Sequence, residues 1–580
     1  MPIGSHQVAQ GSHRRLGTLG VVVGVVAFVG LVWWTRGELG MTWDEPYFFE
    51  RQHEIGAWFG DLLGSPLSRA RAMSHEGLER SWRVARAVPD QHPPVPELLS
   101  LVSSGLVGWL VGPLRSYRLA TVALVAVAAG ALVRLVGSRW GRWASGAALG
   151  ALLFNPRLFA DAQQITADAD TGAFWFLAAV AFLRFTETGR RPWLFGVWAG
   201  LAIMCKATGV LLFPAMVLWA IIHRPRGWWR PIAWSIPIVP LVMVATMPPW
   251  WSNPVGGIRR WVGAFLAYPQ KVPVLYLGEV YDSTRTFLPW HNTIVLTAVM
   301  VPLGLLALAV VGVAAAGRPA AGRRAEGVEP AGSDGPKPGF LPDRVVVSWA
   351  GINFATWMVL RMFPGLPTHD GLRQLVPAFF FLPVLAGYGA GWLTSGLRWV
   401  RVFGQIVVVG CVAGAAWATL SFHPYELAYY NALIGGPRGA KAAGMESTYF
   451  WDPATSEVLD WMNGHLPTGS TVLIFPPPNV LTFGWEQRWG RLRGDLNVLN
   501  LDPPFFNERL ALMTGPQPCY LIFQMRQGLY LPRWGGEPGP FARLAESPAL
   551  YELKPPQVGV RLLAIFDRDD FRRVVQNPTK

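Results

Sequence analysis

The hydrophobic positions of this chain gather in long runs that are separated by short polar loops. A helix that crosses a bilayer needs about 20 predominantly apolar residues. Eleven runs reach or approach this length: 16–36, 117–137, 143–159, 171–185, 193–205, 208–222, 232–250, 290–316, 344–362, 373–393 and 402–421. The pattern therefore predicts a mainly α fold, a polytopic bundle of about 11 transmembrane helices.

A twelfth apolar run, Val95–Leu114, is interrupted by serines and glycines. If this run does not fully cross the membrane, the arginine clusters of the later loops all fall on the same side as Arg14 and Arg15. If it crosses, every later loop inverts, against the tendency of Lys and Arg to stay in the cytoplasm. We therefore expect a re-entrant or surface-lying segment, an N-terminus in the cytoplasm and a C-terminal region outside.

From about residue 422 the pattern becomes that of a soluble domain. Pro453–His465 reads as an amphipathic helix, Thr471–Phe475 and Cys519–Gln524 read as strands, and Leu550–Leu553 with Val558–Phe566 reads as a closing pair. The sequence predicts a small α/β domain, and no phosphate-binding glycine loop or Ser/His/Asp arrangement stands out in it. We expect a structural or acceptor-docking cap.

These patterns divide the chain into two domains. A membrane domain, 1–421, carries a large first outer loop, 37–116, and an extracytoplasmic α/β domain occupies 422–580. The Gly/Ala/Pro-rich cytoplasmic stretch 317–343 is typical of a disordered linker.

Composition and charge support a membrane protein. The 580 residues are 51% hydrophobic and only 15% charged, whereas about a quarter of a soluble domain is charged. The net charge of +14 resides largely in arginines of short loops, which argues against nucleic-acid binding. Three cysteines far apart predict neither a disulfide framework nor a zinc site. The first run is too long for the core of a signal peptide, so we expect an uncleaved first helix.

The candidate chemistry begins directly after the first run. Asp44 and Glu45 lie among aromatic residues in Met41–Phe49, with Pro46 fixing the backbone behind them. At the outer membrane surface such a pair can supply a general base or hold a divalent cation. Alternatively, it only keeps a loop tip in water.

A histidine lies later in the same outer loop, and the second outer loop carries further acids. His92 precedes Pro93-Pro94, which fixes a helix start and would hold the imidazole at the membrane surface. Asp168 and Asp170 precede an apolar helix. One of these acids fits a helix N-cap, and the other is free to face a cavity.

Cations complete the set on the same predicted side. Lys206 interrupts an apolar stretch, where an ionisable residue indicates either a functional site or a side chain that reaches the interface. Arg285 lies in the loop 250–289, and Arg373 follows His369-Asp370-Gly371. An arginine there offers a two-pronged donor for a phosphate, or merely marks the entry of a helix.

The ordered set resembles the GT-C integral-membrane glycosyltransferases, of the protein O-mannosyltransferase and aminoarabinose-transferase type. The resemblance rests on the acidic pair, His-Pro-Pro, the acid of the second outer loop and Gly-Leu-Ala-x-x-x-Lys. It also rests on four segments: 156–171, Leu288–His291, His369–Arg373 and His423–Asn431. It covers about 20–435 and does not extend to the tail.

That resemblance implies a GT-C-like fold and an inverting transfer from a polyprenyl-phosphate-linked sugar at the outer face of the cytoplasmic membrane. It implies that Asp44 is the catalytic base or lies near it, beside Glu45. The second-loop acid maps best to Asp170, with Asp168 as the alternative, because Thr171-Gly172 departs from the usual Leu-Pro or Thr-Pro. Some relatives bind a divalent metal, which here would lie at Asp44 and Asp170; no other cofactor is implied.

The substrate-binding candidates are the remaining polar residues of these loops and segments: His92, Lys206, Arg285, His291, His369, Asp370 and Arg373. Lys206, Arg285 or Arg373 can meet the donor phosphate. The acceptor is a protein, a lipid or a glycan. Two other classes of protein remain as alternatives: a secondary transporter, which would usually show repeated halves, and a non-catalytic scaffold of an envelope complex.

Overall fold

The computed structural model describes most of the chain. The described residues are 22, 24–26, 29–31, 38–83, 92–267, 272–282, 286–318, 341–363, 371–450, 452–502, 504–531 and 540–575. Most of the predicted first helix, 16–36, lies outside this set, as does most of the predicted linker, 317–343.

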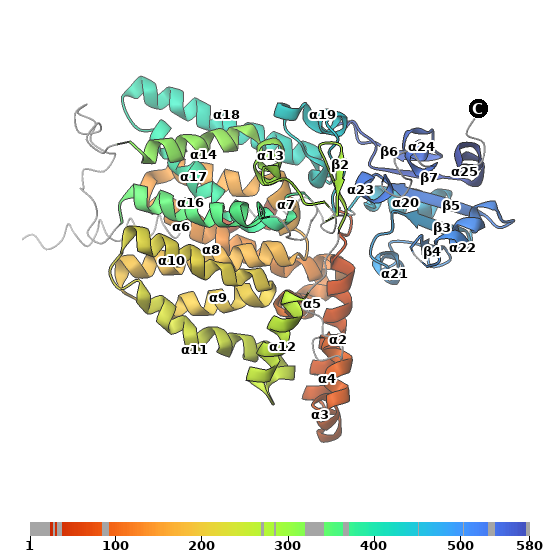
Figure 1. Cartoon of the computed structure of the whole chain (residues 1–580), viewed down its shortest axis with the longest axis horizontal. Coiled ribbons are helices and arrows are strands. Elements are labelled where there is room, and N and C mark those ends of the chain that lie inside the picture. Colours follow the sequence, from red (N-terminus) through yellow and green to blue (C-terminus); the bar gives the residue numbers. More distant parts are fainter. Residues whose placement is uncertain are drawn as a thin grey trace, which may run out of the picture.

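The described chain forms a helical bundle and a C-terminal α/β body beside it, with a helical projection where the two meet (Figure 1). The projection is α2 to α4: Glu45–Leu63, Pro66–Ala72 and His75–Ser81. The bundle comprises α5 Val95–Val111, α6 Pro113–Leu153, α7 Pro156–Ala162, α8 Ala167–Thr188, α9 Trp193–Cys205, η2 Ala207–Leu211, α10 Leu212–His223, α11 Trp229–Ala245, α13 Asn292–Met300, α14 Leu303–Ala316, α16 Asp343–Leu360, η4 Arg373–Phe380, α17 Leu382–Leu393 and α18 Arg398–Phe422. The prediction of a mainly α bundle followed by a small α/β region is confirmed.

Short elements connect these bodies. Between α11 and α13 lie η3 Pro248–Trp250, α12 Pro254–Leu266 and the antiparallel hairpin β1 Val274–Tyr276 and β2 Glu279–Tyr281. After α18 come η5 Glu426–Ala428, η6 Ala432–Ile434 and α19 Gly436–Ala442.

Several predicted spans are bent or broken. Within the described residues, α6 and α18 alone are long and apolar enough to cross a membrane, and up to five spans result if each bent helix pair counts as one. The predicted run 290–316 is a pair, α13 and α14, bent by 119°, because Pro302 has no N–H with which to continue the first helix. The chain is a multi-pass membrane protein, and the number of 11 spans stays a prediction.

Two residues explain how the early spans divide. α6 covers the predicted run 117–137 and most of the run 143–159, and Gly141, with φ of 83°, separates its two helical parts. That backbone conformation suits glycine, which has no Cβ. The helix then ends at Leu153, before Pro156 begins α7, so the predicted run reached too far.

The interrupted run Val95–Leu114 becomes α5, which packs against the start of α6. The hydroxyls of Ser100 and Ser103 donate to the carbonyl oxygens of Tyr117, at 2.9 Å, and Ser116, at 2.6 Å. A helix of 17 residues is about 26 Å long, short of the roughly 30 Å of a hydrocarbon core. This length agrees with the expectation that α5 does not cross, which stays a prediction.

The C-terminal body is built on a five-stranded sheet with the order β4-β3-β5-β7-β6. β3 pairs in parallel with β4 and β5, and β7 pairs antiparallel with β5 and β6. The strands are β3 Thr471–Phe475, β4 Asn497–Asn500, β5 Cys519–Gln524, β6 Tyr551–Leu553 and β7 Leu563–Phe566. β3 and β5 have the predicted bounds and the closing pair is confirmed, whereas β4 was not predicted.

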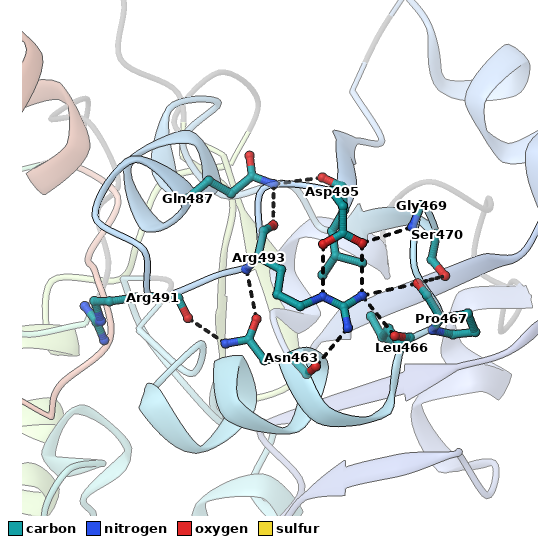
Figure 2. A network of polar contacts seen from close by, with 10 residues as sticks. Asn463, Leu466, Pro467, Gly469, Ser470, Gln487, Arg491, Arg493 and Asp495 are labelled. Atoms are coloured by element: carbon teal, nitrogen blue, oxygen red, sulfur yellow. Dashed lines mark hydrogen bonds and ion pairs between the residues drawn. The ribbon is translucent and has the colours of Figure 1, made fainter.

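Helices surround this sheet and side chains tie its loops together. They are α20 Ser456–His465, α21 Thr482–Arg488, α22 Phe506–Leu510, η7 Ala511–Thr514, α23 Gln527–Tyr530, α24 Pro540–Glu546 and α25 Arg568–Val575. Figure 2 shows Arg493, which pairs with Asp495 at 3.1 Å and donates to the carbonyl oxygens of Asn463, Leu466 and Pro467. This arginine fixes the turn after α20 to the turn before β4.

Candidate active site

A row of alternating charges lies where four distant segments meet. Arg373 donates from Nη2 to Asp44 Oδ2, and from Nε to Asp168 Oδ2 at 3.2 Å. Lys206 Nζ donates to Asp168 Oδ1 at 2.6 Å. The Asp168 side chain is fully buried, whereas those of Asp44 and Lys206 are 19% and 22% exposed. Two carboxylates and two cations thus form one continuous row whose ends reach solvent.

Local backbone structure explains how each member of the row is aimed. Asp44 is the N-cap residue of α2, and its carbonyl oxygen accepts from the Tyr47 N–H at 3.0 Å. Lys206 ends α9 in an extended conformation, which turns its side chain out of the helical register. Arg373 is the first residue of η4.

The helix α8 separates the two candidate acids of its first turn. Its N-cap is Thr166, whose Oγ1 accepts from the Ala169 N–H at 3.2 Å, so the expectation that an aspartate caps this helix was wrong. Residues two positions apart on a helix point about 200° apart. Asp168 therefore faces Lys206 and Arg373, while the buried Asp170 faces away and has Glu97 among its electrostatic neighbours. The structure thus brings Asp168, and not Asp170, to Asp44.

Glu45 is fully buried and occupied on both oxygens. Arg118 donates to Oε1 at 2.8 Å and to Oε2 at 2.7 Å, and the N–H groups of Ile165 and Thr42 donate to the same two oxygens. Arg118 also donates to the carbonyl oxygen of Leu39 at 3.2 Å. This carboxylate therefore fastens the segment Met41–Phe49, here called the acidic loop, to α6.

The two described histidine candidates lie outside the charge row. The His92 carbonyl oxygen accepts from Arg51 Nη2 at 2.8 Å, and its ring meets Tyr47 edge to face at 6.2 Å. These contacts place His92 against the first turns of α2. His291 Nδ1 lies 2.8 Å from the hydroxyl of Tyr276 on β1. Three other candidates, Arg285, His369 and Asp370, lie outside the described residues.

Sequence reasoning missed Phe450, which lies against the centre of the row. The Arg373 guanidinium carbon is 3.9 Å from the centroid of the Phe450 ring. The Phe450 carbonyl oxygen accepts from the N–H of Trp43 at 3.0 Å, next to Asp44. No pattern around Phe450 indicates either contact. The hydrogen bond to Trp43 joins residues about 400 positions apart in the sequence.

A second missed feature is the buried ion pair of α7. Arg157 Nε donates to Asp161 Oδ2 at 2.7 Å, and the Arg157 guanidinium carbon lies 5.9 Å from the Phe450 ring centroid. The spacing of four residues on a helix could have indicated this pair.

The C-terminal body touches the acidic loop directly. Trp485 and Trp489, at the end of α21, lie 6.0 Å and 5.0 Å from the Phe49 ring, and Asn479 Nδ2 donates to the Trp43 carbonyl oxygen at 2.9 Å. Glu486 is nearly fully buried beside this contact, and its Oε2 lies 3.3 Å from Arg491 Nη1. Burial raises the pKa of Glu486 to about 7, although Arg491 and Arg118 oppose the shift.

A cavity of about 560 Å³ opens where the α5–α6 turn meets the C-terminal body. Its polar lining includes Arg115, Tyr425, Glu457 and Arg491, and Trp489 forms part of its wall. None of the candidate residues from the sequence lines this cavity. It lies apart from the charge row, none of whose four residues lines it.

The described residues do not fit a metal ion at Asp44 and Asp170. Asp44 pairs with Arg373, whereas Asp170 faces another side of α8. Within the described part of the chain, no three His, Cys, Asp or Glu side chains are grouped to hold an ion.

Comparison with known proteins agrees with the resemblance drawn from the sequence. Residues 91–251 match the family described as "Dolichyl-phosphate-mannose-protein mannosyltransferase". This segment contains His92, Asp168, Asp170 and Lys206. Among curated proteins none matches the chain.

Three solved structures are similar over most of the chain. ArnT from Cupriavidus metallidurans in the apo state is 15% identical, covers 95% of this chain and 99% of its own, and has a TM-score of 0.46. The same protein bound to undecaprenyl phosphate is 14% identical, the match covers 94% of this chain and 97% of that one, and the TM-score is 0.47. The arabinofuranosyltransferase AftD from Mycobacteria is 13% identical, the match covers 88% of this chain and 36% of that one, and the TM-score is 0.42.

Proposed function

We propose that this protein is an inverting membrane glycosyltransferase that moves a sugar from a polyprenyl-phosphate donor to an acceptor at the outer face of the cytoplasmic membrane. The observation that carries the proposal is the row Asp44–Arg373–Asp168–Lys206. The description of the family that matches 91–251 names dolichyl-phosphate-mannose, which is one polyprenyl-phosphate sugar. This family description supports the donor class, and the row supplies the charges that such a transfer requires.

The transfer needs a base on the acceptor side. An acceptor hydroxyl oxygen bonds to the anomeric carbon while the bond from that carbon to the phosphate oxygen breaks on the opposite face, which inverts the configuration. The hydroxyl proton must leave to a positioned group. Asp44 suits this role better than Asp168, because its side chain is 19% exposed whereas Asp168 is fully buried between two cations.

The leaving phosphate gains negative charge as the bond breaks, and cations fixed in advance stabilise that charge. Arg373 and Lys206 both pair with Asp168, so one buried acid keeps both cations aimed. The planar guanidinium of Arg373 can bind two phosphate oxygens at once. In our proposal the donor phosphate replaces Asp44 as the partner of Arg373, which frees Asp44 to accept the proton.

The other candidates take supporting roles in this proposal. Glu45 positions the acidic loop through Arg118 and does not take part in proton transfer. Asp170 supports the start of α8 from its far side. His92 contacts the substrate beside α2, and Arg285, His291, His369 and Asp370 remain candidates for substrate binding. Sugar class and acceptor are open to direct measurement.

The test is single-turnover transfer by the purified protein in lipid nanodiscs, with polyprenyl-phosphate hexoses and pentoses as separate donors. Asp44→Asn keeps the shape of the side chain and removes its basicity. We expect this variant to lose at least about two orders of magnitude in rate, the usual scale for a general base, with insertion and folding unchanged. Near-normal turnover would exclude Asp44 as the base, and a wild-type protein inactive with every donor would contradict the proposed function.

A further inference from the structure

The segment Glu446–Phe450, here called the strap, crosses from the C-terminal body to the charge row. The loop after β5 holds its first half. Glu446 accepts from the N–H groups of Gln527 and Gly528, each at 2.9 Å, and Gln527 Nε2 donates to Ser447 Oγ at 2.7 Å. All of these groups are buried or nearly so. The strap is therefore part of the C-terminal body rather than a loose connection.

The second half of the strap is fixed as firmly. Arg526 Nη1 donates to the carbonyl oxygen of Thr448 at 3.1 Å, and its guanidinium carbon lies 5.9 Å from the Tyr449 ring centroid. Arg526 is fully buried. These contacts deliver Phe450, the last residue of the strap, to the row.

Phe450 has an unusual backbone conformation. Its φ is 69°, a value that is uncommon for any residue with a Cβ and a genuine outlier for a bulky one. Such conformations persist where the surroundings enforce them, and they gather at functional sites. Here the ring is fully buried and lies 3.9 Å from the Arg373 guanidinium carbon.

We propose that Phe450 is a positioning residue for sugar transfer: its ring fixes the guanidinium of Arg373 so that this arginine keeps its contact with Asp168 while the donor phosphate replaces Asp44 as its other partner. This inference rests on the proposed function. It gives the C-terminal body a part in forming the transfer site, beyond a structural or acceptor-docking cap.

The physical reason lies in the shape of arginine. A guanidinium is flat and stacks on aromatic faces, so its N–H groups then point outward from the edge. Two of these groups already reach Asp44 and Asp168. Without the ring, the long side chain regains rotational freedom and water reaches the guanidinium, which weakens its hold on a phosphate.

Three substitutions separate stacking from simple filling of space. Phe450→Tyr keeps the flat face, Phe450→Leu keeps an apolar side chain without it, and Phe450→Gly removes the side chain while suiting the positive φ. We expect Tyr to retain wild-type transfer and Leu to lose about ten-fold in kcat/KM for the lipid donor. Gly should lose at least as much as Leu, and the KM for the acceptor should stay unchanged in all three.

The matched control is Phe505, whose ring also contacts an arginine within the C-terminal body, with the Arg509 guanidinium carbon at 4.8 Å. Phe505→Ala should leave transfer unchanged. Full activity of folded Phe450→Leu would overturn the inference, because any apolar side chain would then suffice. Loss of activity in Phe450→Tyr equal to that in Phe450→Leu would overturn it too.

A cryo-electron microscopy map of Phe450→Gly tests the inference without any assay of transfer. We expect the Arg373 guanidinium to leave at least one of Asp44 and Asp168. An unmoved guanidinium would overturn the inference. An inactive wild-type protein together with a displaced guanidinium would instead contradict the proposed function alone.

Discussion

At the scale of single residues, the direction in which a side chain points decides more than its type. Asp168 and Asp170 are the same residue two positions apart, yet only Asp168 contacts Lys206 and Arg373. The direction follows from the cap: Thr166 starts α8, and the helical repeat then sends the two acids to opposite sides.

This difference predicts unequal effects of two matched substitutions. Asp168→Asn removes the charge that holds two cations, so we expect single-turnover transfer to fall by about two orders of magnitude or more. Asp170→Asn leaves the row intact and should cost less than about ten-fold. Equal losses, measured on protein of equal thermal stability, would contradict the assignment of Asp168 to the row.

The residue types of the site could be predicted from sequence, but their partners could not. Asp44, Lys206 and Arg373 stand out as charges next to apolar runs, and the structure brings them together. Phe450 is one aromatic among many in this sequence. Only the tertiary contact and its positive φ distinguish it.

At the scale of elements, apolar runs predicted where helices lie, whereas prolines and glycines determined where they break. The bends at Pro302 and Gly141 reflect a missing N–H and a missing Cβ. The strand β4 was missed because its four residues, Asn497–Asn500, have polar ends and partly exposed sides.

The acidic loop and α6 are joined by the buried pair of Glu45 and Arg118. Arg118→Met would leave the Glu45 carboxylate buried without its cation. Breaking a buried pair in this way costs about 3–5 kcal/mol, so we expect a large fall in the apparent Tm. Glu45→Gln keeps part of the hydrogen bonding and should cost less.

Thermal unfolding in a fixed detergent checks this expectation. Arg80→Met is a suitable control, because Arg80 forms an exposed pair with Glu76 on α4, and exposed pairs contribute little. An Arg118→Met protein as stable as the control would show that the pair does not fasten the loop.

The contact between α21 and the acidic loop predicts a dependence on pH. Burial raises the pKa of Glu486 to about 7, above its unfolded value. Between those two values the folded protein binds a proton that the unfolded chain does not, so stability is greatest at the acid end and falls as pH rises toward 7. Burial raises the pKa of Asp452 to about 7 as well, which acts in the same direction.

Apparent Tm measured from pH 5 to pH 8 tests this coupling. The wild-type Tm should fall with rising pH, and Glu486→Gln should reduce the slope because the amide does not titrate. A Glu486→Gln protein with the full wild-type slope would exclude Glu486 as the source.

At the scale of the whole molecule, the distribution of arginines predicts the orientation. We expect the N-terminus and residues near 330 in the cytoplasm, and residues after 430 outside, in line with the preference of Lys and Arg for cytoplasmic loops. Reporter fusions after 330 and after 430 should therefore report opposite sides. Activity of both reporters on one side of the membrane would refute the orientation and, with it, the outer position of the site.

The bond from the Trp43 N–H to the Phe450 carbonyl oxygen also has a consequence during synthesis. The two residues are about 400 positions apart, and a ribosome adds about 5–20 residues per second, so the acidic loop emerges roughly 20–80 s before its partner. Asp44 and Arg373 are 329 positions apart, so for most of that interval Asp44 has neither Arg373 nor the strap beside it. If the charge row is the transfer site, we therefore expect activity to appear only once the C-terminal body has folded against the segment Met41–Phe49, although that segment is among the first to be made.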